Sequence, residues 1–160
     1  MIQAVIGLGS NLDQPIEHVT NAIAELTAAN DISNLTPSSL YRSSPMGPQD
    51  QNDYINAAAK FDTELAPIAL LDLLQTIENN HGRVRIGERW GPRTLDLDLL
   101  MYGNKSIDLP RLKVPHYGIA ERNFVLLPML EILPNVVIPE LGSINELVKA
   151  INKAGIEKLT

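Results

Sequence analysis

The feature that most restricts the fold of this sequence is a short stretch in which leucine and aspartate alternate. Leu95, Leu97 and Leu99 are separated by Asp96 and Asp98. Side chains along a β-strand point to opposite faces in turn, so the pattern predicts a strand with one apolar face and one face that carries both carboxylates. This strand must therefore pack against a hydrophobic core on one side and leave the other side open to solvent or to a ligand.

A segment with four arginines, Gly82–Arg93, directly precedes this strand. Carboxylates two residues apart on one strand face lie roughly 6.5–7 Å apart along the backbone, and they can bind one cation or two cations about 3.5–4 Å apart. Carboxylate oxygens suit Mg²⁺, which keeps substrate phosphates in its shell, and arginines pair with phosphate. The combination predicts phosphoryl-type chemistry. Taken alone, the two aspartates could equally form a solvated strand face, and the arginines could be ordinary surface residues.

Composition limits the class of protein. The chain has no cysteine, which excludes disulfides and thiolate metal sites, and its net charge of −6 argues against general affinity for nucleic acid or acidic membranes. The start Met1–Gly7 lacks the features of a leader, and no apolar run reaches the roughly 18–20 residues that cross a bilayer. We therefore expect a soluble, cytoplasmic protein that binds a small anionic ligand.

Hydrophobic periodicity along the chain changes repeatedly between the strand and the helix period. Strands are expected at Ile2–Leu8, Ile32–Arg42 (interrupted at Thr36–Pro37), Tyr54–Asp62 and the aspartate strand. A first helix is expected to begin at Asp13–Pro15, with an inward apolar stripe of Ile16, Val19, Ile23 and Leu26. A second helix is expected to begin at Ala66–Pro67, with an inward stripe of Leu70, Leu71, Leu74 and Ile77. This β-α-β-β-α-β order predicts an α+β, ferredoxin-like antiparallel sheet with both helices on one face, in a single domain over residues 1–160.

The remainder of the chain predicts a C-terminal αβα extension. A short helix is expected around Phe124–Leu133, and Val136–Ile138 is expected to add an edge strand. Ser143 and Glu146 form a capping-box pattern, which predicts a last helix over Ile144–Ile151.

Several polar residues are candidates for ligand contacts. The turn Gly9–Asn11 follows the first strand, but no P-loop sequence occurs in the chain. Tyr54 and Asn56 share a strand face, where a ring beside a carboxamide can hold a flat heterocycle; the pattern alone favours a face packed under a helix. Gln75 and Glu78 are neighbours on a helix flank, which is by default a solvated surface.

Five segments carry a resemblance to a known family: Arg89–Leu100, Gly9–Asn11, Ser44–Gln51, Tyr54–Ala57 and Val114–Tyr117. With them the sequence resembles the 6-hydroxymethyl-7,8-dihydropterin pyrophosphokinase family of folate biosynthesis. The resemblance implies transfer of a pyrophosphoryl group from ATP to the pterin hydroxymethyl, whose oxygen attacks the β-phosphorus and leaves AMP. It also implies a monomer whose partners are these small molecules, with neither nucleic acid nor membrane.

The resemblance implies roles for individual residues. Asp96 and Asp98 would be the ligands of two Mg²⁺ ions, while Arg83 and Arg93 would neutralise charge on the transferred group and on AMP. The residues implied for the pterin are Gly9, Ser43, Ser44, Met46, Tyr54, Asn56, Trp90 and Phe124, with the ring between Tyr54 and Phe124. The residues implied for ATP are Gln75, Glu78, Arg85, Trp90, Leu99, Arg111, His116, Tyr117 and Arg122, with adenine against Leu99.

The loops Ser44–Gln51 and Gly82–Pro92 would be lids that close over both substrates and exclude water. Two positions depart from the family pattern: Ile86 stands where a lysine is common, and Lys113 stands where a small hydroxyl residue is common. Both departures concern ATP affinity rather than the reaction.

Two other functions remain open from the sequence. A magnesium-dependent nucleotidyltransferase or phosphohydrolase would share the acids and arginines but would release pyrophosphate or inorganic phosphate. A non-catalytic ferredoxin-like module could bind a ligand or RNA, although the acidic charge and an aromatic content of 4% oppose RNA binding.

Overall fold

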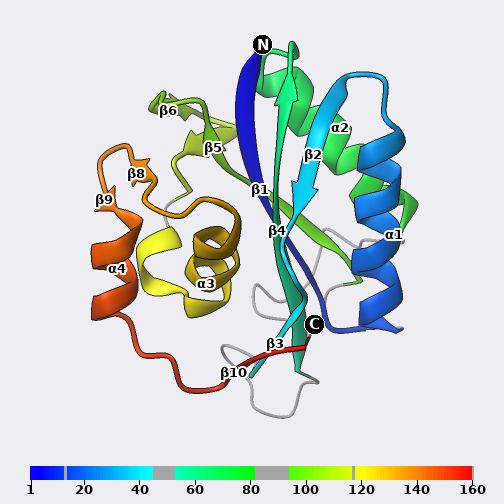
Figure 1. The fold of residues 1–160 in the computed structure, drawn as a ribbon. Helices are drawn as coiled ribbons and strands as arrows, with labels where there is room; N and C mark the ends of the chain where they lie inside the picture. The colour runs from blue at the N-terminus through cyan, green and yellow to red at the C-terminus, as the bar shows by residue number, and fades with distance from the viewer. Residues whose placement is uncertain (13, 45–52, 82–93, 117, 160) are drawn as a thin grey trace.

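The computed structural model describes residues 1–12, 14–44, 53–81, 94–116 and 118–159. These residues form a mixed fold of helices and antiparallel sheet (Figure 1). The strands are β1 Ile2–Ser10, β2 Ile32–Pro37, β3 Tyr41–Ser43, β4 Tyr54–Thr63, β5 Asp96–Tyr102, β6 Ile107–Leu109, β7 Leu112–Val114, β8 Val137–Ile138, β9 Gly142–Ser143 and β10 Ile156–Lys158. The helices are α1 Pro15–Ala28, α2 Pro67–Asn80, α3 Asn123–Ile132 and α4 Ile144–Ala150, with a short 3-10 turn at Ile119–Glu121.

The main sheet has six strands in the order β10-β3-β4-β1-β5, and β2 also pairs with β4. Each of these pairings is antiparallel. The strand β4 is long enough to pair with β3 at its start and with β2 at its end, and the interruption between β2 and β3 lies at residues 38–40. The interruption was expected at Thr36–Pro37, but both of these residues still pair with β4. Between β2 and β3 the contact with β4 is continued by the Ser38 side chain, whose Oγ accepts the Ala58 N–H at 2.8 Å.

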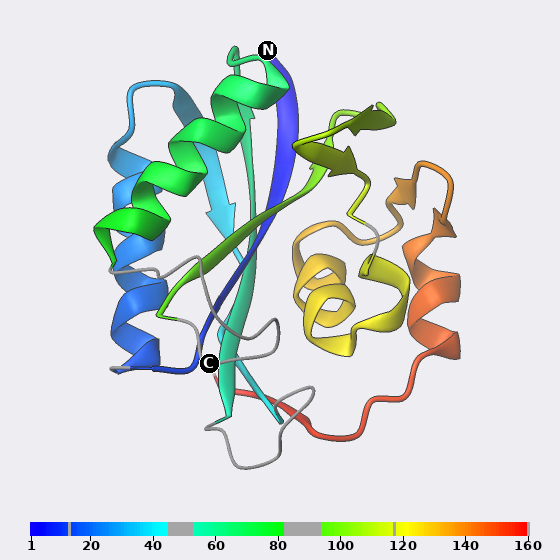
Figure 2. The ribbon, with the colours of Figure 1, turned by 180° about the vertical axis from the view of Figure 1, so that it is seen from behind.

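The helices α1 and α2 cover one face of the sheet, here called the α1/α2 face (Figures 1 and 2). Its core contains Val19, Ala22 and Leu26 of α1, Leu70, Leu71, Leu74 and Ile77 of α2, Ile55, Ala57, Ala59 and Phe61 of β4, and Leu95, Leu97 and Leu99 at β5. The alternation that was read from the sequence is therefore confirmed for β4 and β5. The expectation for Ile16 was wrong: it is 45% exposed, because the buried stripe of α1 runs through Val19, Ala22 and Leu26.

The opposite face, here called the α3 face, is covered over part of its length by α3, with α4 beyond it (Figure 2). Val5, Ala58, Leu100 and Met101 pack there in one apolar cluster with buried residues of α3 and α4 such as Met129. This cluster covers only one end of the face, so the other end is free to carry polar side chains.

The C-terminal region differs from the expected extension in three respects. Among the described residues, Val136–Ile138 does not join the main sheet: β8 pairs with β9, and Ile138 is fully buried in the α3 cluster, which explains its apolar character. A further strand, β10, pairs with β3 at the sheet edge. Ser143 does occupy the N-cap position of α4, but its side chain makes no capping hydrogen bond.

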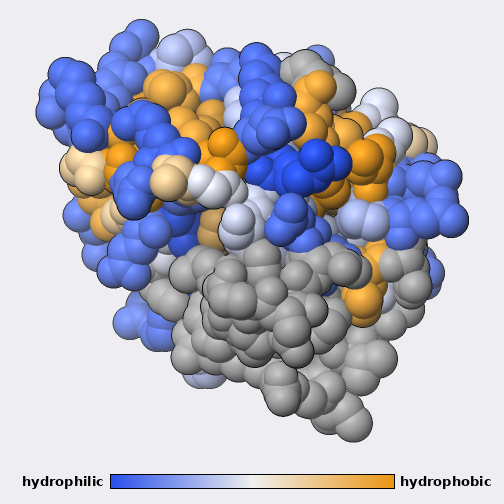
Figure 3. All heavy atoms as spheres, turned by 90° about the horizontal axis from the view of Figure 1, so that it is seen from below, coloured by the Kyte–Doolittle hydropathy of each residue, from blue (hydrophilic) through white to orange (hydrophobic). Residues whose placement is uncertain are grey.

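Within the described residues no helix is long and apolar enough to span a membrane. Large exposed apolar side chains of the described residues are scattered, at Met1, Ile16, Leu109 and Val137. Outside the grey residues, the face in Figure 3 shows hydrophilic and hydrophobic side chains interspersed.

Candidate active site

The floor of the candidate site is the uncovered end of the α3 face. In the sheet register Gly9 lies between Asp96 and Asn56, and Gly7 lies between Asp98 and Ala58. Asp98 is exposed and Asp96 is half-buried, as expected for the polar face of β5. Because neither glycine has a side chain, β1 places no side chain between the two carboxylates and the carboxamide of Asn56. A Cβ at Gly9 would lie 3.3 Å from Asn56 Oδ1, so a larger residue there would push the carboxamide.

The carboxamide of Asn56 is fixed by the neighbouring strand. Its Nδ2 donates to Ser43 Oγ at 2.7 Å, and the two residues are only 4% and 3% exposed. A buried hydrogen bond of this kind holds one rotamer, because breaking it would leave two buried polar groups unsatisfied. Tyr54, which starts β4, is half-buried and shares this face with Asn56, as the alternation predicted.

The segment after β7 brings a histidine and an arginine to the same region. Burial lowers the pKa of His116, and the charge of Arg122 lowers it further, while Asp98 opposes both effects. His116 Nδ1 accepts the Gly118 N–H at 3.1 Å, so the neutral ring carries its proton on Nε2. The site therefore presents a neutral imidazole as a hydrogen-bond donor near Asp98.

Arg122 lies between the 3-10 turn and the aromatic ring of Phe124. Its guanidinium carbon is 5.9 Å from the ring centroid, which is a cation–π distance. A Cβ at position 118 would lie only 2.7 Å from Arg122 Nε, so a side chain there would displace the flexible end of Arg122. This contact of Gly118 was not expected, because a glycine after a breaker-rich segment looks like an ordinary turn residue.

A second group of candidates lies between α2 and β7. Arg111 Nη2 is 2.7 Å from Asp72 Oδ1 and 3.2 Å from Gln75 Oε1. Asp72 was not expected, although it is three residues before Gln75 and thus on the same helix flank. Glu78 is not solvated surface: it is 5% exposed, and its Oε2 accepts the Leu97 N–H at 2.7 Å.

Leu99 has its side chain in the α1/α2 core and is 2% exposed. The expectation that adenine lies against Leu99 stays a prediction, and only a small part of this residue is open to solvent. Six other candidates lie outside the described residues: Met46, Arg83, Arg85, Trp90, Arg93 and Tyr117. The expected lid Gly82–Pro92 lies outside them entirely, and so does Ser44–Gln51 apart from Ser44.

The described candidates thus divide into two sets by their chemistry. One set combines a buried carboxamide, a tyrosine and a phenylalanine, and the other combines a neutral imidazole, two arginines and a glutamine. A family model described as 7,8-dihydro-6-hydroxymethylpterin-pyrophosphokinase (HPPK) matches residues 5–134. The chain belongs to the HPPK family.

Individual relatives agree with this membership. The HPPK-family chain is 52% identical over 149 residues to the 2-amino-4-hydroxy-6-hydroxymethyldihydropteridine pyrophosphokinase of Haemophilus influenzae, covering 93% of this chain and 92% of the relative. It is 47% identical over 160 residues to the enzyme of the same name from Pseudomonas aeruginosa, covering 99% and 98%. A crystal structure of Plasmodium falciparum HPPK-DHPS with pteroate matches 92% of this chain and 40% of the longer one, with a TM-score of 0.71 and 14% identity, which concerns the fold alone.

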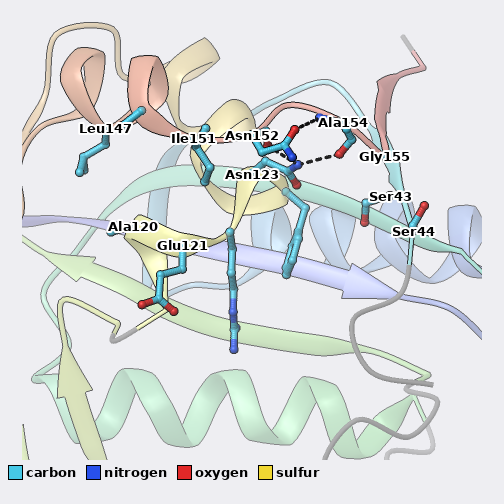
Figure 4. Close-up of a pocket in the computed structure, with 13 residues that line it drawn as sticks. Ser43, Ser44, Ala120, Glu121, Asn123, Leu147, Ile151, Asn152, Ala154 and Gly155 are labelled. Carbon is cyan, nitrogen blue, oxygen red and sulfur yellow. Dashed lines mark hydrogen bonds between the residues drawn. The ribbon is translucent and has the colours of Figure 1, made fainter. Parts of the chain in front are cut away.

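In this HPPK-family chain a cavity of about 440 Å³ opens beside Phe124 (Figure 4). Ser43, Ser44, Arg122 and Phe124 line it, together with residues of the C-terminal segment such as Gly155. The C-terminal segment was not expected at the site, because no local pattern in the sequence links it to residues more than 100 positions earlier.

Proposed function

We propose that this chain transfers the pyrophosphoryl group of ATP to the hydroxymethyl group of 6-hydroxymethyl-7,8-dihydropterin, giving AMP and the pterin diphosphate in folate biosynthesis. Family membership and the names of relatives at 47–52% identity support this reaction. The structural observation that carries the proposal is the floor of the site. The single strand β1 separates Asp96 and Asp98 on β5 from Asn56 on β4, and it has glycine, Gly7 and Gly9, at the positions that pair with the two aspartates.

In this proposal the pterin lies between Tyr54 and Phe124, with its polar edge on Asn56. The carboxamide oxygen remains available beside Gly9, because Asn56 uses its amino group to bind Ser43. The backbone of Gly9, Ser43, Ser44 and Met46, with Trp90, would complete the pocket. An aromatic sandwich with one fixed amide suits a flat heterocycle that has both donors and acceptors.

The nucleotide would occupy the second set of residues. Gln75 on α2 and Arg111 in the turn between β6 and β7 would bind it, and His116 and Arg122 would face the phosphates. The remaining contacts would come from Glu78, Arg85, Trp90, Leu99 and Tyr117. His116 is suited to donate from Nε2, because its Nδ1 accepts the Gly118 N–H. Glu78 and Leu99 are 5% and 2% exposed, so each offers a nucleotide only a small surface.

Asp96 and Asp98 fit a magnesium site completed by substrate. In the part of the chain that the structure describes, no group of three or more His, Cys, Asp or Glu side chains could hold a metal unaided. Mg²⁺ is commonly bound by one or two carboxylates together with phosphates, which matches this pair. When bound, two such ions would neutralise phosphate charge; Arg83 and Arg93 would add to this, and both lids would exclude water.

Two finer points complete the proposal. The strand order and the two helices on one face support a ferredoxin-like core with an elaborated C-terminal extension. A monomer is proposed because the sequence resembles this family.

The test is phosphorus NMR of the protein with Mg-ATP and 6-hydroxymethyl-7,8-dihydropterin. We expect AMP and a pterin diphosphate, and their formation should require both the pterin and magnesium. Release of pyrophosphate or inorganic phosphate would instead favour a nucleotidyltransferase or a phosphohydrolase. Intact ATP in the presence of folded protein would favour a binding module.

A further inference from the structure

We propose that Asn123 is a positioning residue for the pterin pocket: through the C-terminal segment Asn152–Gly155 it holds Phe124 and Ser44 in fixed relation to each other. The inference rests on the proposed function, because it assigns a purpose to the residues around the pterin. It concerns a residue that need not touch the substrate.

The Asn123 side chain binds the C-terminal segment with both of its donor hydrogens. Nδ2 donates to Asn152 O at 2.9 Å and to Ala154 O at 3.0 Å (Figure 4). The Ala154 N–H donates to Asn152 Oδ1 at 2.9 Å, which closes a small turn within the segment. A carboxamide has two N–H donors, so Asn123 uses its full donor capacity on this one turn.

The other end of the same segment binds the opposite side of the cavity. The Ser44 N–H donates to Gly155 O at 2.9 Å, and the next residue, Ile156, pairs with Ser43 in the β10–β3 ladder. Gly155 has φ +76°, a left-handed backbone conformation that favours glycine, and a Cβ there would make only an ordinary contact with Ser44 Oγ at 3.4 Å. The segment therefore forms a strap from Asn123 to Ser44.

Asn123 does not cap the start of α3. Arg122 is the N-cap residue of α3, and this helix has no side-chain cap, so Asn123 does not stabilise the helix in that way. Both ends of the strap line the same cavity, which also contains Phe124 and Ser43. Since Phe124 directly follows Asn123, and Ser43 fixes the Asn56 carboxamide, the strap controls the spacing between the aromatic wall and the amide wall of the pocket.

The test compares Asn123→Ala and Asn123→Asp with wild type in steady-state assays of pterin diphosphate formation. Loss of two neutral hydrogen bonds corresponds to a change on the order of tenfold in an equilibrium constant. We expect the KM for the pterin to rise by about this factor, while the KM for ATP and kcat stay within about twofold. Asn123→Asp, which has the same shape but no donors, should show an equal or larger effect.

Asn145→Ala is the matched control. Asn145 Nδ2 also makes an exposed amide hydrogen bond, to Asn135 Oδ1 at 2.7 Å, but it lies on α4 and does not line the cavity. Its kinetic constants should equal those of wild type. In hydrogen exchange, the Ser44 and Ala154 amides should lose protection in Asn123→Ala and keep it in Asn145→Ala.

The outcomes separate this inference from the proposed function. An inactive wild-type protein would end both. With an active wild type, an unchanged pterin KM in Asn123→Ala overturns the positioning role alone. Equal increases in both KM values with a lower Tm also overturn it, because they indicate general destabilisation. A selective rise in the pterin KM with loss of Ser44 protection supports it.

Discussion

The two faces of the main sheet are built from the same strands but carry different side chains. On the α1/α2 face, β4 presents Ile55, Ala57, Ala59 and Phe61, and each is buried in one apolar core. On the α3 face the same strand presents Tyr54, Asn56 and Ala58. Along β5 the contrast is between leucines on one face and Asp96 and Asp98 on the other.

The difference shows how one sheet supports both stability and a site. The α1/α2 face is covered along both helices, so it supplies apolar burial, which is the main favourable contribution to folding. The α3 face is divided along its length: one end packs against α3 through Leu100 and Ala58, while the other end has glycine, asparagine and aspartate. Polar side chains at that end are held by a rigid sheet without weakening the main core.

The largest effect is expected for Asp98→Ala, which tests the α3 face. We expect kcat for pterin diphosphate formation to fall by at least about 10³-fold, as for loss of a group that stabilises developing charge. Because Asp98 is exposed, the free energy of unfolding should change by no more than about 0.5 kcal/mol. Asp31→Ala, at an exposed carboxylate in the turn before β2, is the control and should keep full activity. Normal turnover in folded Asp98→Ala would refute the assignment.

Phe61→Ala tests the α1/α2 face. Phe61 is 1% exposed, so its truncation should lower the free energy of unfolding by about 3–5 kcal/mol through lost burial and a new cavity. Urea denaturation measures this loss, and kcat below the unfolding transition should stay close to wild type. Val137→Ala, at a residue that is 67% exposed, should change stability little. The contrast between the faces would fail if Phe61→Ala reduced kcat as strongly as Asp98→Ala.

Ser43→Ala tests whether the polar end of the α3 face contributes to stability. The substitution leaves Asn56 Nδ2 buried without its partner, which should cost about 1–3 kcal/mol of unfolding free energy. The pterin KM should rise as well, since the carboxamide is no longer fixed. Ser33→Ala removes the hydroxyl of a half-buried serine that makes only a weak 3.6 Å hydrogen bond to Met1 Sδ; it serves as the control, with no measurable change expected. A neutral result for Ser43→Ala would mean that water replaces the hydroxyl.

The smallest effect is expected for Glu131→Gln, at the link between α3 and β3. Burial alone would raise the pKa of Glu131, but hydrogen bonds from Tyr41 and Ser39 and the charge of Lys158 lower it overall. A carboxylate with a lowered pKa stabilises the fold above its unfolded pKa of about 4.5, and this contribution is lost as the pH falls through the folded pKa.

Urea unfolding of wild type and Glu131→Gln at about pH 7 and about pH 3.5 measures the loss. At neutral pH the free energy of unfolding of the two proteins should differ by less than about 1 kcal/mol, because Glu131 is exposed to solvent. At the acid pH this difference should disappear. An equal difference at both pH values would show that the carboxylate charge has no role.

Local sequence patterns determined the framework of this protein. The alternation around Asp96 and Asp98 fixed which face of β5 is buried, and the helical spacing of Val19 and Leu26 identified the packed side of α1. These predictions succeeded because strand and helix periods are set by the backbone, and burial of one face follows from them. The same reasoning misplaced Ile16 and Val136–Ile138, since an apolar residue or run does not specify which surface will cover it.

The contacts that shape the site were decided only by the tertiary structure. Ser43 and Asn56 meet because β3 pairs with β4, and Gly118 leaves room for Arg122, which folds back over it. The strap from Asn123 to Ser44 joins residues that are far apart in the sequence, so it leaves no periodic trace. Short polar side chains form such bonds wherever packing brings partners within about 3 Å, and that proximity is a property of the whole fold.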